Sequence, residues 1–393
     1  MSKLRLSLLS CAILGLAACG GGQQQAAPAP SDQTAASGSS EAEPASNLPE
    51  TAELKIFNWA DYVDPDTITD FEKQNNIKVS VQYFDSNEAL EAKVLTGRSG
   101  FDLVAPSNAF VGRQIQAGAY QKIDKSLIPN YSNINPALME MMTQVDPGNE
   151  YAVPFFWGTN TLGINSERVK QALGTDELPD NLWDLVFNPE YTAKLKRCGI
   201  TYLDSPSEMY PLALNYIKRD PNSNESADID AATALLKENR PNVIRFSSTD
   251  YIDNLARGDT CVAVGYGGDL NIAKRRMSEA TGKDLIRVLA PKEGMGIWVD
   301  SWMIPADAGN VLNAHRYINW QLDPKVAAQN GNFVTFAPAA TAARDLMEAE
   351  YGQDPTIFPA DKDLENSFIM APPKPDTLKL MLRQWQEVKA GKK

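Results

Sequence analysis

The feature that most constrains the fold is a repeated pattern: a short apolar run, a polar or aromatic turn, and the start of a helix. It is clearest at 54–62, which reads Leu-Lys-Ile-Phe-Asn-Trp-Ala-Asp-Tyr and is soon followed by an Asp-Pro pair. Such a run is typical of a buried strand, and Asp-Pro commonly begins a helix. We therefore predict that Trp59, Asp61 and Tyr62 lie at the carboxyl end of a strand, where open α/β sheets bind ligands.

The same pattern continues along the chain and predicts an α/β fold. At 393 residues the chain is too long for one ordinary core, so we expect two lobes. Strands that alternate with helices form parallel, doubly wound sheets. The apolar stretches 151–157 and 161–164 are interpreted as the passage into the second lobe. Strands are predicted at 54–58, 77–83, 101–105, 199–203, 260–265 and 296–304, and helices at 64–74, 85–97, 208–216, 249–255, 310–322 and 377–388, with another ending near 281.

The N-terminus is predicted to be an export signal with a lipid attachment site. A short basic stretch precedes an apolar stretch at 6–16, which has signal-peptide length and is too short to span a bilayer. It ends in Leu-Ala-Ala-Cys-Gly, which resembles a bacterial lipobox, so we expect 1–18 to be removed and Cys19 to be lipidated. An ordinary secretory signal is the alternative. Residues 19–50 are rich in Gly, Gln, Ala, Pro and Ser and are predicted to form a flexible tether.

Export would place the remaining cysteines where disulfides persist. Cys198 and Cys261 are the two cysteines beyond the N-terminal region, and an even number favours pairing. We predict a disulfide between them, with two separately buried thiols as the alternative.

Charge and composition argue against several classes of partner. The chain has 37 Lys and Arg against 50 Asp and Glu, a net charge of −13. Loss of the predicted signal removes two basic residues and gives 35 minus 50, or −15. Nucleic-acid binders need basic patches, so we expect no nucleic-acid partner. His315 is the single histidine, which leaves little material for a His-rich metal site, and we expect no metal or other cofactor.

Acidic and aromatic side chains recur at the predicted strand ends. Counting by twos along 296–304, Trp298, Asp300 and Trp302 project from one face of the strand. Carboxylates neutralise ammonium groups, while aromatic faces attract cations and cover methylene stems. The pattern therefore favours a slot for a linear, multiply charged amine. The strand-end set is Trp59, Asp61, Tyr62, Ser107, Asp204, Glu208, Tyr266, Asp269, Trp298 and Asp300.

These residues also have structural interpretations. Asp61 and Asp204 are better explained as helix caps, and Glu208 as a complement to a helix dipole. Asp269 follows two glycines and could be an N-cap, whereas Asp300 is hard to dismiss because charges are seldom buried without a partner. Sugar binding, or a glycosidase with paired carboxylates, is the competing function. The chain has no catalytic signature, so we predict that it is not an enzyme.

Six segments carry a resemblance to a known family: Asn-Trp-Ala-Asp-Tyr at 58–62, Phe-Asp-Ser-Asn-Glu at 84–88, Gly-Phe-Asp-Leu-Val-Ala-Pro-Ser at 100–107, Leu-Asn-Tyr at 214–216, Asp-Pro-Asn-Ser at 220–223 and Pro-Lys-Glu-Gly at 291–294. From about Glu53 to the C-terminus, the chain resembles the polyamine-binding proteins of bacterial ABC importers. It is closer to the putrescine-binding branch than to the spermidine-binding branch.

The resemblance implies a type II periplasmic-binding-protein fold, in which crossing hinge strands join two lobes that close on the ligand. Lobe 1 would comprise 53–157 and 280–330, and lobe 2 would comprise 158–279 and 331–393. The implied function is delivery of putrescine or spermidine to an ABC permease. We expect a periplasmic monomer held to a membrane by its lipid anchor, with display on the cell surface as an alternative.

The resemblance also implies a set of ligand-contacting residues: Trp59, Ala60, Tyr62, Ser107, Glu208, Tyr266, Asp269, Trp298, Asp300 and Phe336. Asp300 and Asp269 would be the main ammonium partners, between walls formed by the Trp and Tyr rings. The family often has a hydroxyl residue at position 60, so Ala60 would contact through its backbone. Tyr266 and Phe336 replace a common Trp and Tyr, and Trp298 is similar to the spermidine branch. The choice between a diamine and a triamine therefore stays open.

Overall fold

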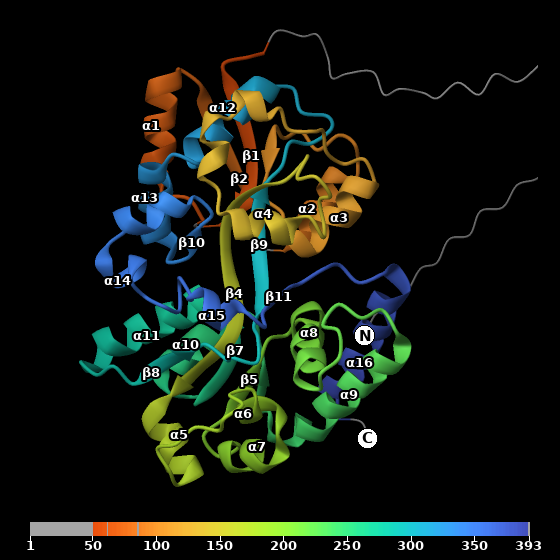
Figure 1. Ribbon diagram of the computed structural model, residues 1–393, viewed down its shortest axis with the longest axis vertical. Coiled ribbons are helices and arrows are strands. Elements are labelled where there is room, and N and C mark those ends of the chain that lie inside the picture. The colour runs from red at the N-terminus through yellow and green to blue at the C-terminus, as the bar shows by residue number, and fades with distance from the viewer. Residues whose placement is uncertain (1–49, 61, 85, 392–393) are drawn as a thin grey trace, which may run out of the picture. The chain divides into compact units, whose positions relative to one another are not determined.

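The computed structural model describes residues 50–60, 62–84 and 86–391 (Figure 1). The predicted signal peptide 1–18, the lipidation site Cys19, nearly all of the tether, and Asp61 lie outside these residues. None of the helices in these ranges combines the length and the apolar character needed to cross a membrane.

The order of elements agrees with the predicted alternation of strands and helices. The strands are β1 (Glu53–Trp59), β2 (Lys78–Phe84), β3 (Leu103–Val104), β4 (Val153–Asn165), β5 (Ile200–Tyr202), β6 (Arg245–Phe246), β7 (Val262–Tyr266), β8 (Ile286–Leu289), β9 (Gly296–Trp302), β10 (Ala337–Pro338) and β11 (Phe368–Ile369). The helices are α1 (Pro65–Asn75), α2 (Asn87–Val94), α3 (Asn108–Gln116), α4 (Pro136–Met142), α5 (Ser166–Leu173), α6 (Asp184–Phe187), α7 (Pro189–Leu195), α8 (Pro206–Tyr216), α9 (Ser226–Asn239), α10 (Tyr251–Arg257), α11 (Gly267–Thr281), α12 (Val311–Gln321), α13 (Pro324–Val334), α14 (Ala349–Gly352), α15 (Asp361–Leu364) and α16 (Pro375–Lys389).

The predicted strands and helices are present within a few residues of their predicted limits. The sequence did not predict several helices, among them α3, α9 and α13. From Val153 on, the stretches 151–157 and 161–164 form one strand, β4, because pairing with neighbouring strands continues across the residues between them.

The first sheet positions the residues that follow β1 and β3. β1 lies between β2 and β3, and both pairings are parallel. Leu54 and Ile56 alternate with more exposed residues along β1 and are buried in the core, as a strand covered on one face requires. The Asp64 side chain caps α1 by accepting from the Asp66 N–H at 2.9 Å, as predicted. Trp59 is the last residue of β1, so it lies at the carboxyl end of a strand, also as predicted.

The long strand β4 passes from one apolar core into another. Its residues 153–160 pair with β9, and 160–164 pair with β7, both antiparallel. Val153 and Phe156 belong to the core built around the first sheet, whereas Leu162 and Ile164 belong to the second core. Figure 1 shows β4 and β9 running side by side along this passage. Elsewhere in the second sheet, β5 pairs in parallel with β6 and β7, and β9 with β11.

The two cores divide the chain differently from the predicted lobe limits in two segments. Buried side chains between Val334 and Ile369 pack in the first core, although 331–393 was assigned to lobe 2. Ile286 and Leu289 pack in the second core, although 280–330 was assigned to lobe 1. How the chain divides into lobes stays a prediction.

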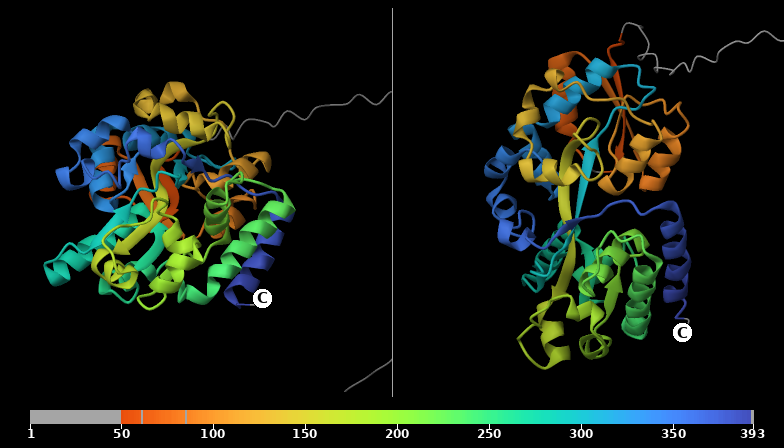
Figure 2. Two further views of the ribbon diagram at one scale, coloured as in Figure 1. Left: turned by 60° about the horizontal axis from the view of Figure 1, so that its bottom comes forward. Right: turned by 45° about the vertical axis from the view of Figure 1, so that its right-hand side comes forward.

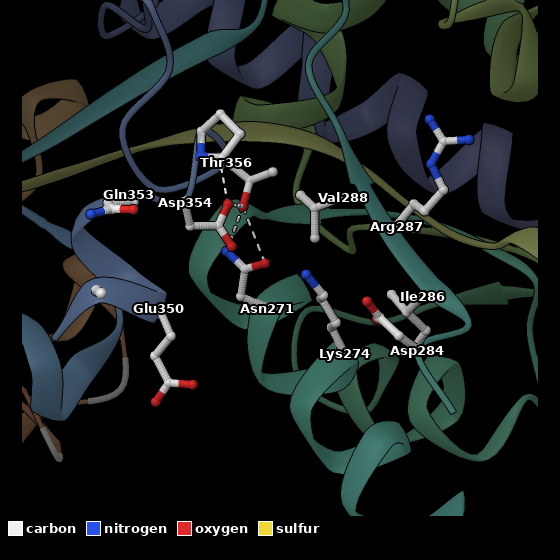
Figure 3. A pocket seen from close by; sticks show the side chains of 12 residues that line it. Asn271, Lys274, Asp284, Ile286, Arg287, Val288, Glu350, Gln353, Asp354 and Thr356 are labelled. Atoms are coloured by element: carbon white, nitrogen blue, oxygen red, sulfur yellow. Dashed lines mark hydrogen bonds between the residues drawn. The ribbon is translucent and has the colours of Figure 1, made fainter. Parts of the chain in front are cut away.

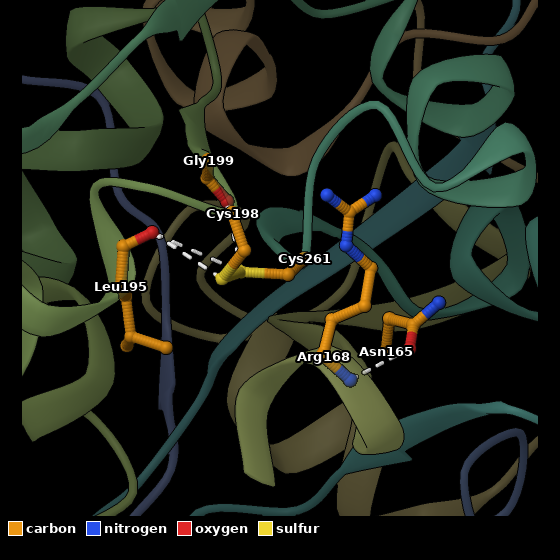
Figure 4. The surroundings of a disulfide bond; sticks show 6 residues. All are labelled: Asn165, Arg168, Leu195, Cys198, Gly199 and Cys261. Atoms are coloured by element: carbon orange, nitrogen blue, oxygen red, sulfur yellow. Dashed lines mark hydrogen bonds between the residues drawn. A yellow bond between two sulfur atoms is a disulfide. The ribbon is translucent and has the colours of Figure 1, made fainter. Parts of the chain in front are cut away.

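A disulfide joins Cys198 and Cys261, with their Cα atoms 5.4 Å apart (Figure 4). It links the segment after α7 to the segment before β7, two positions separated by 63 residues in sequence. This pairing confirms the predicted disulfide and excludes the alternative of two separate thiols.

The interpretation of Asp204 as a helix cap is wrong. Ser205 is the N-cap residue of α8, whereas Asp204 bonds to the C-terminal helix α16. The Asp204 carboxylate accepts from Trp385 Nε1 at 3.0 Å and from Lys389 Nζ at 2.9 Å. In Figures 1 and 2, α16 lies beside α8 and α9, so Asp204 helps to hold this helix bundle together.

Candidate functional site

Asp300 lies in the middle of β9 and is only 5% exposed. Its carboxylate accepts from the Tyr62 hydroxyl at 2.7 Å and from the Ser107 hydroxyl at 2.5 Å. Ser107 reaches it because the segment after β3 forms an antiparallel bridge with β9 at these two residues. Among the described residues, no Lys, Arg or His forms an ion pair with Asp300. Burial raises the pKa of Asp300 to about 6, against the opposing effect of the two hydroxyls.

Strand register places several predicted site residues on one face of the second sheet. Gly158 of β4 lies opposite Trp298 of β9, and Phe156 lies opposite Asp300. Asn160 lies opposite Tyr266 of β7. Because opposite residues in an antiparallel pair project their side chains from the same face, all of these side chains share one face.

Four aromatic rings form a continuous group on this face. Phe336, between α13 and β10, packs perpendicular to Trp298 with ring centroids 4.9 Å apart. Trp298 also contacts Tyr266 at 6.3 Å, and Phe336 contacts Tyr62 at 6.0 Å. Trp302 has a different role: it is fully buried and packs against core rings instead.

Two glycines make this ring group possible. A Cβ atom at Gly158 would lie 2.5 Å from the Trp298 ring, and one at Gly268 would lie 2.2 Å from the Phe336 ring. Such distances are too short for real contacts, so a side chain at either position would displace the ring.

Glu208 is a second acid without a cationic partner among the described ion pairs. It lies in the first turn of α8, where it accepts from Asn160 Nδ2 and, at 3.2 Å, from the Tyr266 hydroxyl. Burial raises the pKa of Glu208 to about 7, although both hydrogen bonds oppose this shift, and the negative charge of Asp300 adds to it. Complementing the helix dipole alone does not account for these contacts.

Asp269 is a third acid of the cluster and is partly buried. It lies in the first turn of α11, and Tyr266 is the N-cap residue, so the interpretation of Asp269 as an N-cap is wrong. Its carboxylate accepts from the Tyr251 hydroxyl at 2.7 Å. Burial raises the pKa of Asp269, while the hydrogen bond from Tyr251 and the charge of Arg276 lower it. Burial, then Asp300 and then the charge of Asp269 raise the pKa of Tyr62.

Trp59 and Ala60 lie at the end of β1. The Trp59 ring packs against Phe84 with centroids 4.4 Å apart, and its Nε1 donates to the Ala105 carbonyl at 3.0 Å. Ala60 is exposed. A ligand contact by either residue stays a prediction.

Sequence reasoning missed three polar residues that support the acids: Asn87, Asn160 and Tyr251. Asn87 exchanges two hydrogen bonds of 3.0 Å with Ser107, through its side-chain amide. It lies in the segment 84–88 that carried the family resemblance. Asn160 was visible as an amide in the middle of a mainly apolar strand, whereas nothing local marked Tyr251.

A surface pocket of about 330 Å³ lies elsewhere, between the α11–β8 region and the segment 349–356 (Figure 3). None of the ten predicted ligand residues lines it. Within the described ranges, no group of three or more His, Cys, Asp and Glu side chains is placed to hold a metal ion. The candidate site is therefore the cluster of three acids and four aromatic rings described above, and its chemistry suits an organic cation. Its members are Asp300, Glu208, Asp269, Tyr62, Tyr266, Trp298 and Phe336.

Comparison with known proteins defines the class of the molecule. The family of bacterial extracellular solute-binding proteins matches residues 66–360, and the chain belongs to this family. It is 42% identical over 339 residues to the putrescine-binding periplasmic protein SpuD of Pseudomonas aeruginosa, covering 86% of this chain and 92% of that protein. It is 41% identical over 340 residues to the putrescine-binding periplasmic protein PotF of Escherichia coli, with the same coverage of both.

Solved structures agree with these relatives. A putative spermidine/putrescine ABC transporter protein from Listeria monocytogenes has a TM-score of 0.73 and 30% identity, covering 86% of this chain and 99% of its own. The TpPotD lipoprotein of Treponema pallidum has a TM-score of 0.73 and 26% identity, with the same coverage. The predicted type II α/β fold and the resemblance to polyamine-binding proteins are thereby confirmed. The protein is an extracytoplasmic solute-binding protein and not an enzyme, as predicted.

Proposed function

We propose that this protein captures putrescine or spermidine outside the cytoplasm and delivers it to an ABC permease. The observation that carries the proposal is Asp300: a buried carboxylate that receives only two hydroxyl hydrogen bonds and no described cation. An ammonium group would supply the missing positive charge. The names of the similar putrescine-binding proteins support the same class of ligand.

The proposed ligand-contacting set is the ten residues predicted from the sequence. Asp300 and Asp269 bind the ammonium groups, and the rings of Tyr62, Tyr266 and Trp298 cover the carbon chain. Each aromatic face contributes about 0.5–2 kcal/mol, depending on how far the cation is desolvated. Contact with two lobes at once gives the ligand a higher affinity for a closed state, which is how binding would drive closure.

Attachment through Cys19 would keep the binding domain near the permease. A flexible tether of about 30 residues has an end-to-end distance of roughly 30 Å. We propose that the protein works as a monomer. A Cys19→Ala variant is expected to leave the membrane fraction and remain in the soluble fraction, and continued membrane association would contradict the lipid anchor.

The test is calorimetric titration of the protein that begins after Cys19. The ligands are putrescine, spermidine, spermine, maltose and a basic amino acid. Binding of one or more polyamines at micromolar or lower concentration, with one site per chain, supports the proposal. A response to maltose and none to any polyamine would favour the carbohydrate alternative and overturn the proposal.

A further inference from the structure

The side chain of Asn160 is fully buried and only half satisfied. It lies on β4 at the position where pairing with β9 ends and pairing with β7 begins, opposite Gly296 on one side and Tyr266 on the other. Its Nδ2 donates to Glu208, whereas its Oδ1 has no hydrogen-bond partner among the described residues. A buried carbonyl oxygen without a hydrogen-bond partner destabilises the folded protein, so it calls for an explanation.

The surroundings of Asn160 indicate what would satisfy this oxygen. Its side chain projects from the sheet face that also carries Trp298 and Asp300, between the strands that hold Trp298 and Tyr266. The free group is an acceptor, so the missing partner is a donor. Glu208, its neighbour, is an acid whose partners are Asn160 and Tyr266. A donor that carries positive charge would complement both Glu208 and the free oxygen.

We propose that Asn160 is a further ligand-contacting residue, whose Oδ1 accepts an N–H from a ligand ammonium or secondary amine while its Nδ2 holds Glu208 in place. Asn160 therefore belongs to the specificity-determining set, because it selects nitrogen groups that retain an N–H. The burial of Asn160 does not argue against contact with the ligand, because Asp300, the main proposed ammonium partner, is itself only 5% exposed. This inference rests on the proposed function and goes beyond the ten residues carried over from the family resemblance.

The experiment is a double-mutant cycle measured by calorimetry with putrescine and spermidine. The four proteins are the wild type, Asn160→Leu, Glu208→Gln and the double variant. Asn160→Leu is expected to weaken binding about 10- to 100-fold, the effect of one hydrogen bond to a charged group. The loss is expected to persist in the Glu208→Gln background, because Asn160 contacts the ligand directly.

A loss that disappears in the Glu208→Gln background would mean that Asn160 only positions Glu208, and would overturn the proposal. An unchanged affinity in Asn160→Leu would overturn it as well. Absence of polyamine binding by the wild type would instead overturn the proposed function. These results are distinguishable because each concerns a different protein of the cycle.

Thr161→Val is the matched control. Thr161 is the next residue of β4, projects from the opposite face, and donates from its buried hydroxyl to the Leu289 carbonyl at 2.5 Å. Its replacement also removes a buried hydrogen bond, and is expected to lower stability without changing affinity. If Asn160→Leu does not fold, a crystal structure of the wild type with putrescine decides the question. A ligand nitrogen about 3 Å from Asn160 Oδ1 supports the contact, and one beyond about 4 Å overturns it.

Discussion

Two buried carboxylates, Asp102 and Asp300, differ in the hydrogen-bond donors that the fold supplies to them. Asp102 is 4% exposed and accepts from the backbone N–H groups of Lys55, Gly309 and Asn310 at 2.9–3.1 Å, and from the Asn310 side chain. It thereby joins the start of β1 to the segment before α12. Asp300 is equally buried but receives two hydroxyl hydrogen bonds only.

The difference lies in the partners and not in the depth of burial. Backbone N–H groups are fixed donors that stabilise a carboxylate permanently. Hydroxyls can rotate, and two of them leave part of the acceptor capacity of Asp300 unused. The fold therefore satisfies Asp102 by itself, whereas among the described residues it offers Asp300 two hydroxyl donors only, which fits the proposed role of Asp300 in binding a cation.

The largest expected effect is on ligand binding by Asp300→Asn. This change keeps the shape of the side chain and removes its charge, so polyamine affinity is expected to fall by about 2–5 kcal/mol. Calorimetric titration measures the loss. An affinity within twofold of the wild type would show that Asp300 does not bind the ligand. It would also contradict the proposed difference in role between Asp300 and Asp102.

Asp102→Ala is expected to show the opposite behaviour. It leaves several buried N–H donors without an acceptor. The free energy of unfolding is therefore expected to fall by about 2–4 kcal/mol, measured by urea denaturation. The polyamine affinity of the folded protein is expected to stay the same. A large loss of affinity without loss of stability would contradict the structural role of Asp102.

The pH dependence of binding sharpens the contrast further. Glu208, with a pKa of about 7, and Asp300, with a pKa of about 6, take up protons in the ligand-free protein as pH falls. Both must release these protons to pair with a cation, so affinity is expected to drop about tenfold or more between pH about 8 and about 5. Titrations in buffers of different ionisation enthalpy measure the protons released. Equal affinity across this range, with no proton release, would contradict the prediction.

The same acids affect the stability of the ligand-free protein. Burial raises the pKa of Asp300 above its ordinary value of 3.8, so the folded state holds this proton more tightly than the unfolded chain does. The contribution of Asp300 to stability is therefore favourable at low pH and is lost as pH rises through about 6. Asp300→Asn is accordingly expected to stabilise the ligand-free protein above about pH 7, by about 1–3 kcal/mol, and to have little effect near pH 4. Urea denaturation at the two pH values is the measurement.

The smallest expected effect is that of Gly158→Ala, which tests the aromatic wall. The added methyl group displaces the Trp298 ring, so affinity is expected to fall by about 1 kcal/mol through weaker cation–π contact. Gly163→Ala is the matched control on the same strand. There the methyl group meets Leu255 and Leu270 in the second core and is expected to lower stability alone. Equal effects of both changes on affinity would show that the ring position is unimportant.

The sequence by itself determined the local features of this protein. Apolar runs followed by capping residues predicted β1 and α1, because helix starts and strand burial depend on neighbouring residues. Cysteine count and the expected export predicted the Cys198–Cys261 disulfide. The family resemblance gave the ten candidate residues. Three of them are acids with raised pKa values: Asp300, which is buried, and Glu208 and Asp269, which are partly buried.

The tertiary structure decided which acids matter and what surrounds them. Asp204 and Asp300 were both acids near strands, yet one bonds to α16 and the other to Tyr62 and Ser107. Those hydroxyls are 238 and 193 residues away from Asp300 in sequence. Likewise, the register of β4 against β7 places Asn160 opposite Tyr266, and the packing of α8 brings Glu208 to both of them. Such partners follow from strand register and core packing, which depend on the whole chain and leave no local mark in the sequence.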